Sequence, residues 1–486
     1  MEHSCHILLF PFQWRINDLD KKDFSKQISL KNIAFDPNSM WERSITQATD
    51  EEKMLFNEKN YFYEFAHGAL FDDGEEEGNL MQHYERKETD SGNVLFSFGH
   101  GKKTYTLHLK YLNLNLYETG VGVLSFYLYN DTYEDPDDIL TINQFARRVY
   151  PPYWEEVENR KLLADFVRIE GLNGSYEENF QNYTLADDNI PASYITHLIK
   201  DLATNIDIIP VVDDRMYVLS WYKNDKLSKE FSASEEIEPL KQNDFWYKYV
   251  FIEAEEMICH NRKMRNRQIE QSTYLRWQGK GAFYGCSRYS FVFLTNSRCP
   301  DFLISNFETE YVRMAELVLV QRASVLRFSE EISVLSSDKF DNTYLSKRVN
   351  SLRKEFIRFV NQVHFREVTA QDQGIEIYEK LYKFADLQRH VEKLDAEIEE
   401  LDNYVSMVED RNINRIAGNL SMVASFFVPA TVLSGIFGMN NTWANGLNDG
   451  EFSSRLWQNP LFELGLIIIV SILFVLGFYL MKKRKK

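Results

Sequence analysis

The chain has 486 residues, 73 of them acidic and 55 basic, so its formal net charge at pH 7 is -18. A protein that binds nucleic acid needs a basic surface, and this balance excludes nucleic acid as the expected partner. A protein of this negative charge could attract divalent cations to its surface. The charge suits ordinary solubility equally well.

The cysteines and the N-terminus indicate a protein of a reducing compartment. The cysteines at positions 5, 259, 286 and 299 form neither a CxxC pair nor a zinc-binding pattern. We expect them to be reduced, structural thiols. The first residues have no charged stretch followed by an apolar one, so we expect no secretory signal. No Ser/His/Asp or Cys/His arrangement points to catalysis, and we do not expect an enzyme.

Residues 1–296 have the pattern of an α/β cytosolic domain. Residues 94–98 and 104–109 flank a glycine-rich turn and predict a hairpin. Residues 111–117 and 121–129 alternate with the period of strands. A further strand is expected in 283–294. A helix is expected in 191–203, with Pro191 at its first position.

Two charged clusters lie in this part. The acidic run 72–77 could bind cations, although a solvated loop is the simpler interpretation. A basic cluster could meet an anionic ligand such as a nucleotide, or form a solvated helix face paired with nearby acids. Its residues are Arg262, Lys263, Arg265 and Arg267.

Residues 297–374 predict a helical part of the same domain, with long helices in 308–335 and 344–365. An apolar seam in steps of three and four follows, which requires a partner helix. The seam consists of Phe384, Leu387, Val391, Leu394, Ile398, Leu401, Val405 and Val408. We expect one continuous helix over 375–437, with 375–415 as a stalk. The seam can pack on the preceding helices of the same chain or on neighbouring subunits.

Two apolar runs, 416–437 and 461–481, each have about the 20 residues that a helix needs to cross a bilayer. They predict a first transmembrane segment at 416–440, an outer loop at 441–460 and a second segment at 461–481. The basic tail 482–486 should stay in the cytoplasm, because basic flanks mark the cytoplasmic side. Both termini are then cytoplasmic.

Heptad spacing continued into the first apolar run selects a stripe of small or weakly polar residues. Small residues allow close helix approach and also leave room for a water-filled pore, so both interpretations stay open. The stripe consists of Ala417, Ser421, Ala424, Val428, Thr431 and Gly435, flanked by Asn414 and Leu420.

The end of the first run reads Gly435-Ile436-Phe437-Gly438-Met439-Asn440, with Pro429 and Thr431 upstream. This C-terminal part resembles the CorA family of magnesium channels, whose signature is Gly-Met-Asn at this place. The resemblance implies a homopentamer in the inner (plasma) membrane that conducts Mg²⁺ and other divalent cations. Mg²⁺ would be both the transported ion and a regulatory ligand.

The resemblance also implies roles for single residues. The Gly438 carbonyl and the Asn440 side chain would face the hydrated ion, and Met439 would support the bend. Asn414 would lie at the cytoplasmic mouth, with Leu420 as the gate behind it. The outer loop differs from the family, because Asn448-Asp449-Gly450-Glu451 stands in place of a Met-Pro-Glu-Leu type motif. This puts strict magnesium selectivity in doubt, and Co²⁺, Ni²⁺ or Zn²⁺ could share the route.

The large, aromatic N-terminal body also resembles the divergent CorA-like proteins associated with type III CRISPR systems. That resemblance implies an alternative function as a membrane effector of antiviral defence. A nucleotide second messenger, such as an S-adenosylmethionine–AMP conjugate, would then gate the same pore scaffold. A third interpretation is a membrane-anchored sensor whose spans form no pore.

Overall fold

The computed structural model describes residues 2–17, 28–45, 58–74, 80–149, 162–174, 176–180, 191–337, 342–438, 469 and 472. The chain divides into two compact units, Met1–Leu401 and Asp402–Lys486. The boundary falls within a helix, so the domain limits expected from the sequence remain predictions.

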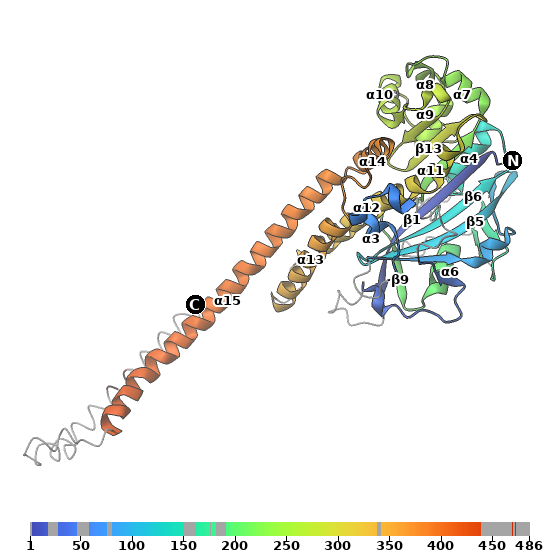
Figure 1. Cartoon of the computed structure of the whole chain (residues 1–486). Helices are drawn as coiled ribbons and strands as arrows, with labels where there is room; N and C mark the ends of the chain where they lie inside the picture. The colour runs from blue at the N-terminus through green and yellow to red at the C-terminus, as the bar shows by residue number, and fades with distance from the viewer. Residues whose placement is uncertain are drawn as a thin grey trace, which may run out of the picture. The chain divides into compact units, whose positions relative to one another are not determined.

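The first unit is built on one large, mostly antiparallel sheet (Figure 1). Its main path is β11-β12-β13-β10-β1-β6-β5-β4-β7-β8, with β2 and β3 beside β5 and with β9 beside β1. Among the described residues, the pair of β10 and β13 is the parallel one. The strands are β1 (Ser4–Ile16), β2 (Trp41–Arg43), β3 (Met81–Arg86), β4 (Leu95–His100), β5 (Lys103–Tyr117), β6 (Val121–Asn130), β7 (Phe166–Glu170), β8 (Tyr176–Asn179), β9 (Ile206–Pro210), β10 (Tyr217–Lys223), β11 (Thr273–Tyr274), β12 (Phe283–Cys286) and β13 (Ser290–Thr295).

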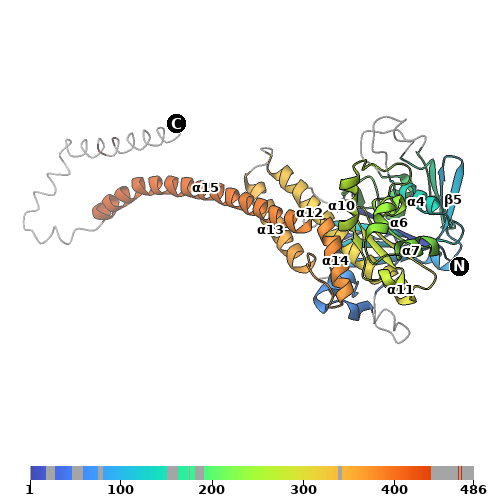
Figure 2. The ribbon, with the colours of Figure 1, turned by 90° about the horizontal axis from the view of Figure 1, so that it is seen from above.

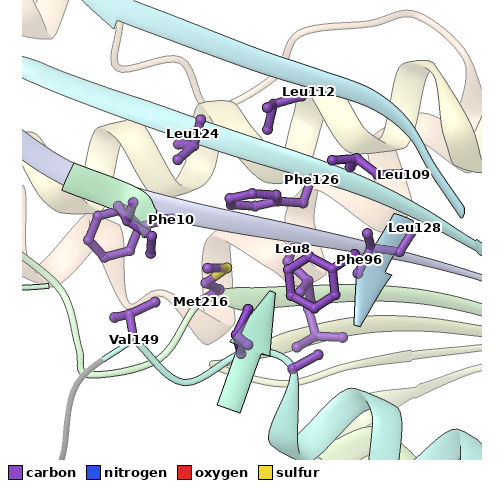
Figure 3. Close-up of a cluster of buried hydrophobic side chains, with 14 of the residues drawn as sticks. Leu8, Phe10, Phe96, Leu109, Leu112, Leu124, Phe126, Leu128, Val149 and Met216 are labelled. Atoms are coloured by element: carbon purple, nitrogen blue, oxygen red, sulfur yellow. The ribbon is translucent and has the colours of Figure 1, made fainter. Parts of the chain in front are cut away.

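The central strand β1 is buried on both faces, which explains its nearly continuous apolar sequence. Successive side chains of a strand point to opposite faces of the sheet. Phe10 and its even-numbered neighbours therefore join the main apolar core, as Leu124 and Phe126 of β6 do. Figure 3 shows part of this core, with Phe10 and Phe126 on neighbouring strands.

Helices cover both faces of the sheet. The core face is covered by α4 (Pro136–Phe145), α6 (Ser193–Leu202) and α9 (Asp244–Phe251), whose apolar side chains belong to the core. The other face is covered by α12 (Glu310–Leu335), which packs against β1 and β6. Further helices are α3 (His67–Leu70), α7 (Asp225–Phe231), α8 (Glu238–Gln242), α10 (Arg262–Ser272), α11 (Asp301–Glu308), α13 (Asn342–Gln362), α14 (Asp372–Phe384) and α15 (Leu387–Gly438).

The strands and helices expected between residues 94 and 365 are present, with three differences in detail. The two segments 104–109 and 111–117 form one strand, β5, with an irregularity between Leu109 and Tyr111. The segment 283–294 contains two paired strands, β12 and β13. The helix expected from Pro191 begins at Ser193, so the proline lies before the helix.

The prediction of one continuous helix over 375–437 is wrong, because the chain breaks between α14 and α15. Asp386 has a φ of 55°, in the left-handed region, and this ends the helical path of α14. Its carboxylate accepts a hydrogen bond from Arg389 Nε at 2.7 Å, in the first turn of α15. At 1.5 Å per residue, α15 alone is roughly 78 Å long (Figure 1).

Most of the apolar seam is buried within the single chain. Leu387 and Leu394 are each 1% exposed, and Ile398 is 2% exposed. Phe384, Leu401 and Val408 are half-buried. The seam thus packs within its own chain, as the intramolecular interpretation requires, and needs no neighbouring subunit at these positions.

A carboxylate in this seam should destabilise the fold. We expect Leu394→Asp and Ile398→Asp each to lower the free energy of unfolding by about 3 kcal/mol or more, because a buried charge has no compensating partner there. Thermal unfolding of the purified full chain in detergent measures the effect. The control is Asn403→Asp, which adds the same charge at an exposed position of α15. Seam variants that unfold at the same temperature as this control would contradict the packing described here.

Candidate functional site

The C-terminal half of α15 carries the residues for which the sequence predicts a pore. Within this helix, Asn414, Ala417, Leu420, Ser421, Ala424, Val428 and Thr431 are all exposed in the single chain. Gly435 lies in the last turn, and Gly438 is the final residue of the helix. The structure therefore places the expected stripe on one uninterrupted helix.

This stripe is not a continuation of the buried seam. Val405 of the seam is buried, whereas Asn414, at the start of the stripe, is exposed. The two lie about two and a half turns apart at 3.6 residues per turn, which puts them on opposite sides of the helix. The expectation that one heptad count runs from the seam into the stripe is thus wrong. The seam is buried along the N-terminal part of the helix, and from Ile413 to Phe427 most described side chains are exposed, those of the stripe included.

A second stripe of larger apolar side chains lies one residue before Asn414, Ala417, Ser421, Ala424 and Val428. These side chains are between 50% and 71% exposed, although they are among the bulkiest apolar residues of the helix. A contiguous apolar surface of this kind indicates contact with another protein surface or with lipid. The residues are Ile413, Ile416, Leu420, Val423 and Phe427.

The Thr431 hydroxyl has a defined orientation. Its Oγ1 donates a hydrogen bond to the Phe427 carbonyl at 2.6 Å, one turn back along the helix. The hydrogen is therefore engaged, and the oxygen presents its lone pairs outward. Thr431 can accept hydrogen bonds from a ligand or from water, but cannot donate one without breaking the bond within the helix.

Several predicted features lie outside the described residues. They are Met439 and Asn440 of the signature, the loop acids Asp449 and Glu451, the basic tail, and the second apolar run except for Ile469 and Ile472. Among the helices that the structure describes, none is long and apolar enough to cross a membrane.

The basic cluster lies on α10, which begins after its capping residue Asn261. Arg265 forms an ion pair with Asp244, at 3.4 Å between Nη1 and Oδ1. Arg262, Lys263 and Arg267 are exposed and make no ion pair within the described part of the chain. The interpretation as a helix face paired with local acids therefore holds for Arg265 alone.

Asp72, the first residue of the acidic run 72–77, is not solvated, and Glu75, Glu76 and Glu77 lie outside the described residues. Asp72 is fully buried, and both its oxygens accept hydrogen bonds from the Arg43 guanidinium at 2.8 Å. Asp72 also accepts from the backbone of Gly74 and His83. This carboxylate anchors the chain between β2 and β3, and it is not free to bind a cation. The described residues contain no cluster of three His, Cys, Asp or Glu side chains that could hold a metal ion.

A buried charged network that the sequence analysis missed joins α12 to α13. Arg348 pairs with Glu331, and also with Glu355 at 3.1 Å. Arg327 lies 3.3 Å from Glu331 and 3.4 Å from Glu355. Burial lowers the pKa of Arg348 to about 10, which shows the cost of desolvating the network. The Arg327–Glu331 spacing of one helical turn is the signal in the sequence that could have revealed it.

These ion pairs hold the two helices in register, and Figure 2 shows α12 and α13 side by side. The pairs cross from the C-terminal half of α12 to Arg348 and Glu355, on either side of the middle of α13. Each carboxylate contacts both arginines, so the loss of one leaves two buried positive charges undercompensated.

Comparison with known proteins gives one finding at the C-terminal end. Residues 319–484 match the family model described as CorA-like Mg2+ transporter protein. The match begins inside α12 and extends through the whole of α15, and it is consistent with a CorA-family protein. No curated protein shows significant similarity to the chain. The match supports a divalent-cation transporter in general.

The charged network gives a stability prediction. We expect Glu331→Gln to lower the free energy of unfolding by about 3 kcal/mol, since removing one member of a buried ionic network leaves its partners unpaired. Thermal unfolding of the full chain measures the loss. Glu399→Gln removes an exposed carboxylate from α15 and should leave the unfolding temperature nearly unchanged. Equal stability of the two variants would mean that the network does not hold α12 to α13.

Proposed function

Starting from the CorA-like match at its C-terminal end, we propose that the chain forms a divalent-cation channel of the inner membrane with Mg²⁺ as its main ion. The observation that carries the proposal is the course of α15. This helix lies wholly within the matched residues and continues to Gly438, the first residue of the Gly-Met-Asn signature.

The two exposed stripes of α15 fit a symmetric pore. In a homopentamer, the stripe of small residues from Asn414 to Gly435 would face the common axis. Apart from Leu420, which flanks the first stripe, the adjacent stripe with Ile416 and Val423 would contact neighbouring helices and lipid, which accounts for its exposure in a single chain. The buried seam, on the opposite side of the helix, would then point outward from the axis.

The chemistry of the stripe suits a hydrated ion. Mg²⁺ gives up its waters reluctantly, and those waters present hydrogen-bond donors to the pore wall. A wall that recognises them must therefore offer acceptors. The Gly438 carbonyl and the Asn440 amide oxygen would form the outer ring, supported by Met439. Thr431, whose hydroxyl oxygen is directed outward, would form an acceptor ring one step further in.

Leu420 is the candidate gate. It is the most exposed of the apolar side chains on this part of α15, at 71%. In a five-fold ring, such side chains would form an apolar constriction that a strongly hydrated ion cannot enter until the ring widens. Asn414 would form a polar mouth on the cytoplasmic side of this constriction.

The remaining features follow from the apolar runs. The first run, 416–437, and the second, 461–481, would cross the membrane, with the basic tail and the N-terminal body in the cytoplasm. Asp449 and Glu451 would concentrate cations at the outer entrance. The altered outer loop leaves room for Co²⁺, Ni²⁺ or Zn²⁺ as further ions.

Gating requires a ligand that binds the open and closed states with different affinity. Mg²⁺ bound between acidic faces of neighbouring subunits would reduce their repulsion and favour the closed pentamer. Loss of this Mg²⁺ would loosen the assembly and raise the conductance, so that cellular Mg²⁺ would limit its own entry.

We propose a second candidate function that concerns residues 1–318, which the family match does not cover. This body would then be the receptor of a CRISPR-associated membrane effector, gated by a nucleotide second messenger. The exposed residues Arg262, Lys263 and Arg267 are candidates for contact with it. A rise in liposome conductance on addition of the S-adenosylmethionine–AMP conjugate, without any change in Mg²⁺, would favour this function over the first.

The filter gives the sharpest test of the pore. We expect Asn440→Ala to reduce Mg²⁺ uptake by liposomes about tenfold or more, because each subunit loses an acceptor for the waters of the ion. The variant should assemble and unfold as the wild type does. Uptake is followed with a Mg²⁺-sensitive dye inside the vesicles.

The control for this test is Asn445→Ala, which removes an amide from the outer loop but not from the signature. It should conduct at the wild-type rate. If Asn440→Ala conducts as well as this control, the signature does not form the filter.

A further inference from the structure

A cavity of 260 Å³ lies in the first unit, where the turn between β5 and β6 meets α12 and α13. Five apolar side chains form part of its wall: Ile28, Leu80, Phe328, Phe359 and Val363. Phe328 and Phe359 have ring centroids 5.6 Å apart, so they give the cavity an aromatic side. This is the usual character of a small-molecule site, in which apolar walls carry a few polar groups.

The polar groups of the cavity are mainly basic. Arg327, from the network between α12 and α13, is 1% exposed and lies at the buried side. Lys354 and Arg358 belong to the exposed side of α13 and form the rim. Lys354 and Arg358 make no ion pair within the described part of the chain, although the Arg358 Nε donates to Gln362 at 2.9 Å.

Two carboxylates also line the cavity. Glu355 pairs with Arg327 and Arg348, so Glu355 and Arg327 offset each other. Burial raises the pKa of Glu118. Lys354 and Arg358 therefore remain as two basic groups against the one carboxylate of Glu118. In a chain of net charge -18 this is a local positive site, which repels Mg²⁺ and attracts an anion.

We infer that this cavity binds a small organic anion that has an aromatic or apolar part. Its phosphate or carboxylate would lie at the rim, against Lys354 and Arg358. Its apolar part would enter between the walls that Phe328 and Phe359 form. Thr119 also lines the path, and its hydroxyl, which accepts from the Ser324 hydroxyl at 3.0 Å, can donate to the ligand.

The position of the cavity gives this binding a consequence. The cavity is lined by residues inside and outside the segment that matches the family model. Glu118 and Thr119 lie before this segment, and the lining residues of α12 and α13 lie within it. A bound anion would bridge the turn after β5 to the helical hairpin and stabilise their contact. The ligand would thus bind partly to residues 1–318, which have no family match, and would act on the helices α12 and α13, which lie mostly within the match.

Binding to this cavity does not depend on whether the protein forms a pore, so it can be tested separately. The probes are phenyl phosphate and AMP, which have an aromatic ring and a phosphate. Phenol and adenosine are their neutral counterparts, and inorganic phosphate lacks the ring. Calorimetry and thermal unfolding of the full chain in detergent measure binding to each.

The variant Lys354→Glu with Arg358→Glu reverses the charge of the rim at exposed positions and should fold normally. We expect it to weaken binding of either organic phosphate about tenfold or more, since it replaces two charge-assisted contacts with repulsion. The matched control, Lys347→Glu with Lys383→Glu, makes the same change of charge at exposed positions that do not line the cavity. The control should bind as the wild type does.

Three results would overturn the inference. The first is no binding of phenyl phosphate or AMP at millimolar concentration. The second is an equal loss of binding in the rim variant and in its control, which would show a non-specific charge effect. The third is equal binding of inorganic phosphate or of the neutral counterparts, because the site would then lack either its aromatic or its anionic recognition.

Discussion

The structure depends on α15 having two parts that meet different surroundings. The seam around Leu394 and Ile398 is buried within the chain, whereas most described side chains from Ile413 onward are exposed, including the stripe that begins at Asn414. Apolar side chains exposed over such a length of helix indicate partners outside the chain, in further copies or in lipid.

The elements around α15 are fixed by interactions of a different kind. The ion pairs of Arg327 and Arg348 set the register of α12 on α13, and α12 packs on the sheet through β1 and β6. The break at Asp386 lets α14 and α15 take separate directions. A ligand that changed the contact between the sheet and the α12–α13 hairpin would thus act close to the N-terminal end of α15.

Local patterns in the sequence were sufficient for β4, β5, β6, β12, β13, the long helices α12 and α13 and the seam, because each rests on the spacing of apolar residues. They did not predict the central strand β1, whose nearly continuous apolar sequence has no alternating pattern. They failed where a distant partner decides. Asp72 lies in an acidic run that has the pattern of a solvated loop, but Arg43 pairs with it in the interior. Asp386 breaks a helix with no proline or glycine to signal the break. The cavity beside Arg327 forms where the turn after β5 meets α12 and α13, and no local sequence pattern predicts this contact. The pore residues themselves remain predictions, since Met439 and Asn440 lie outside the described residues.

The most direct test of the central claim is the flux of Mg²⁺ into liposomes that contain the purified full chain. The account predicts that Mg²⁺ enters these vesicles faster than it enters protein-free vesicles, and that a large organic cation does not follow it. Entry of Mg²⁺ at the protein-free rate, with the oligomer intact in the membrane, would contradict the account. The exposed stripe of α15 would then serve assembly alone.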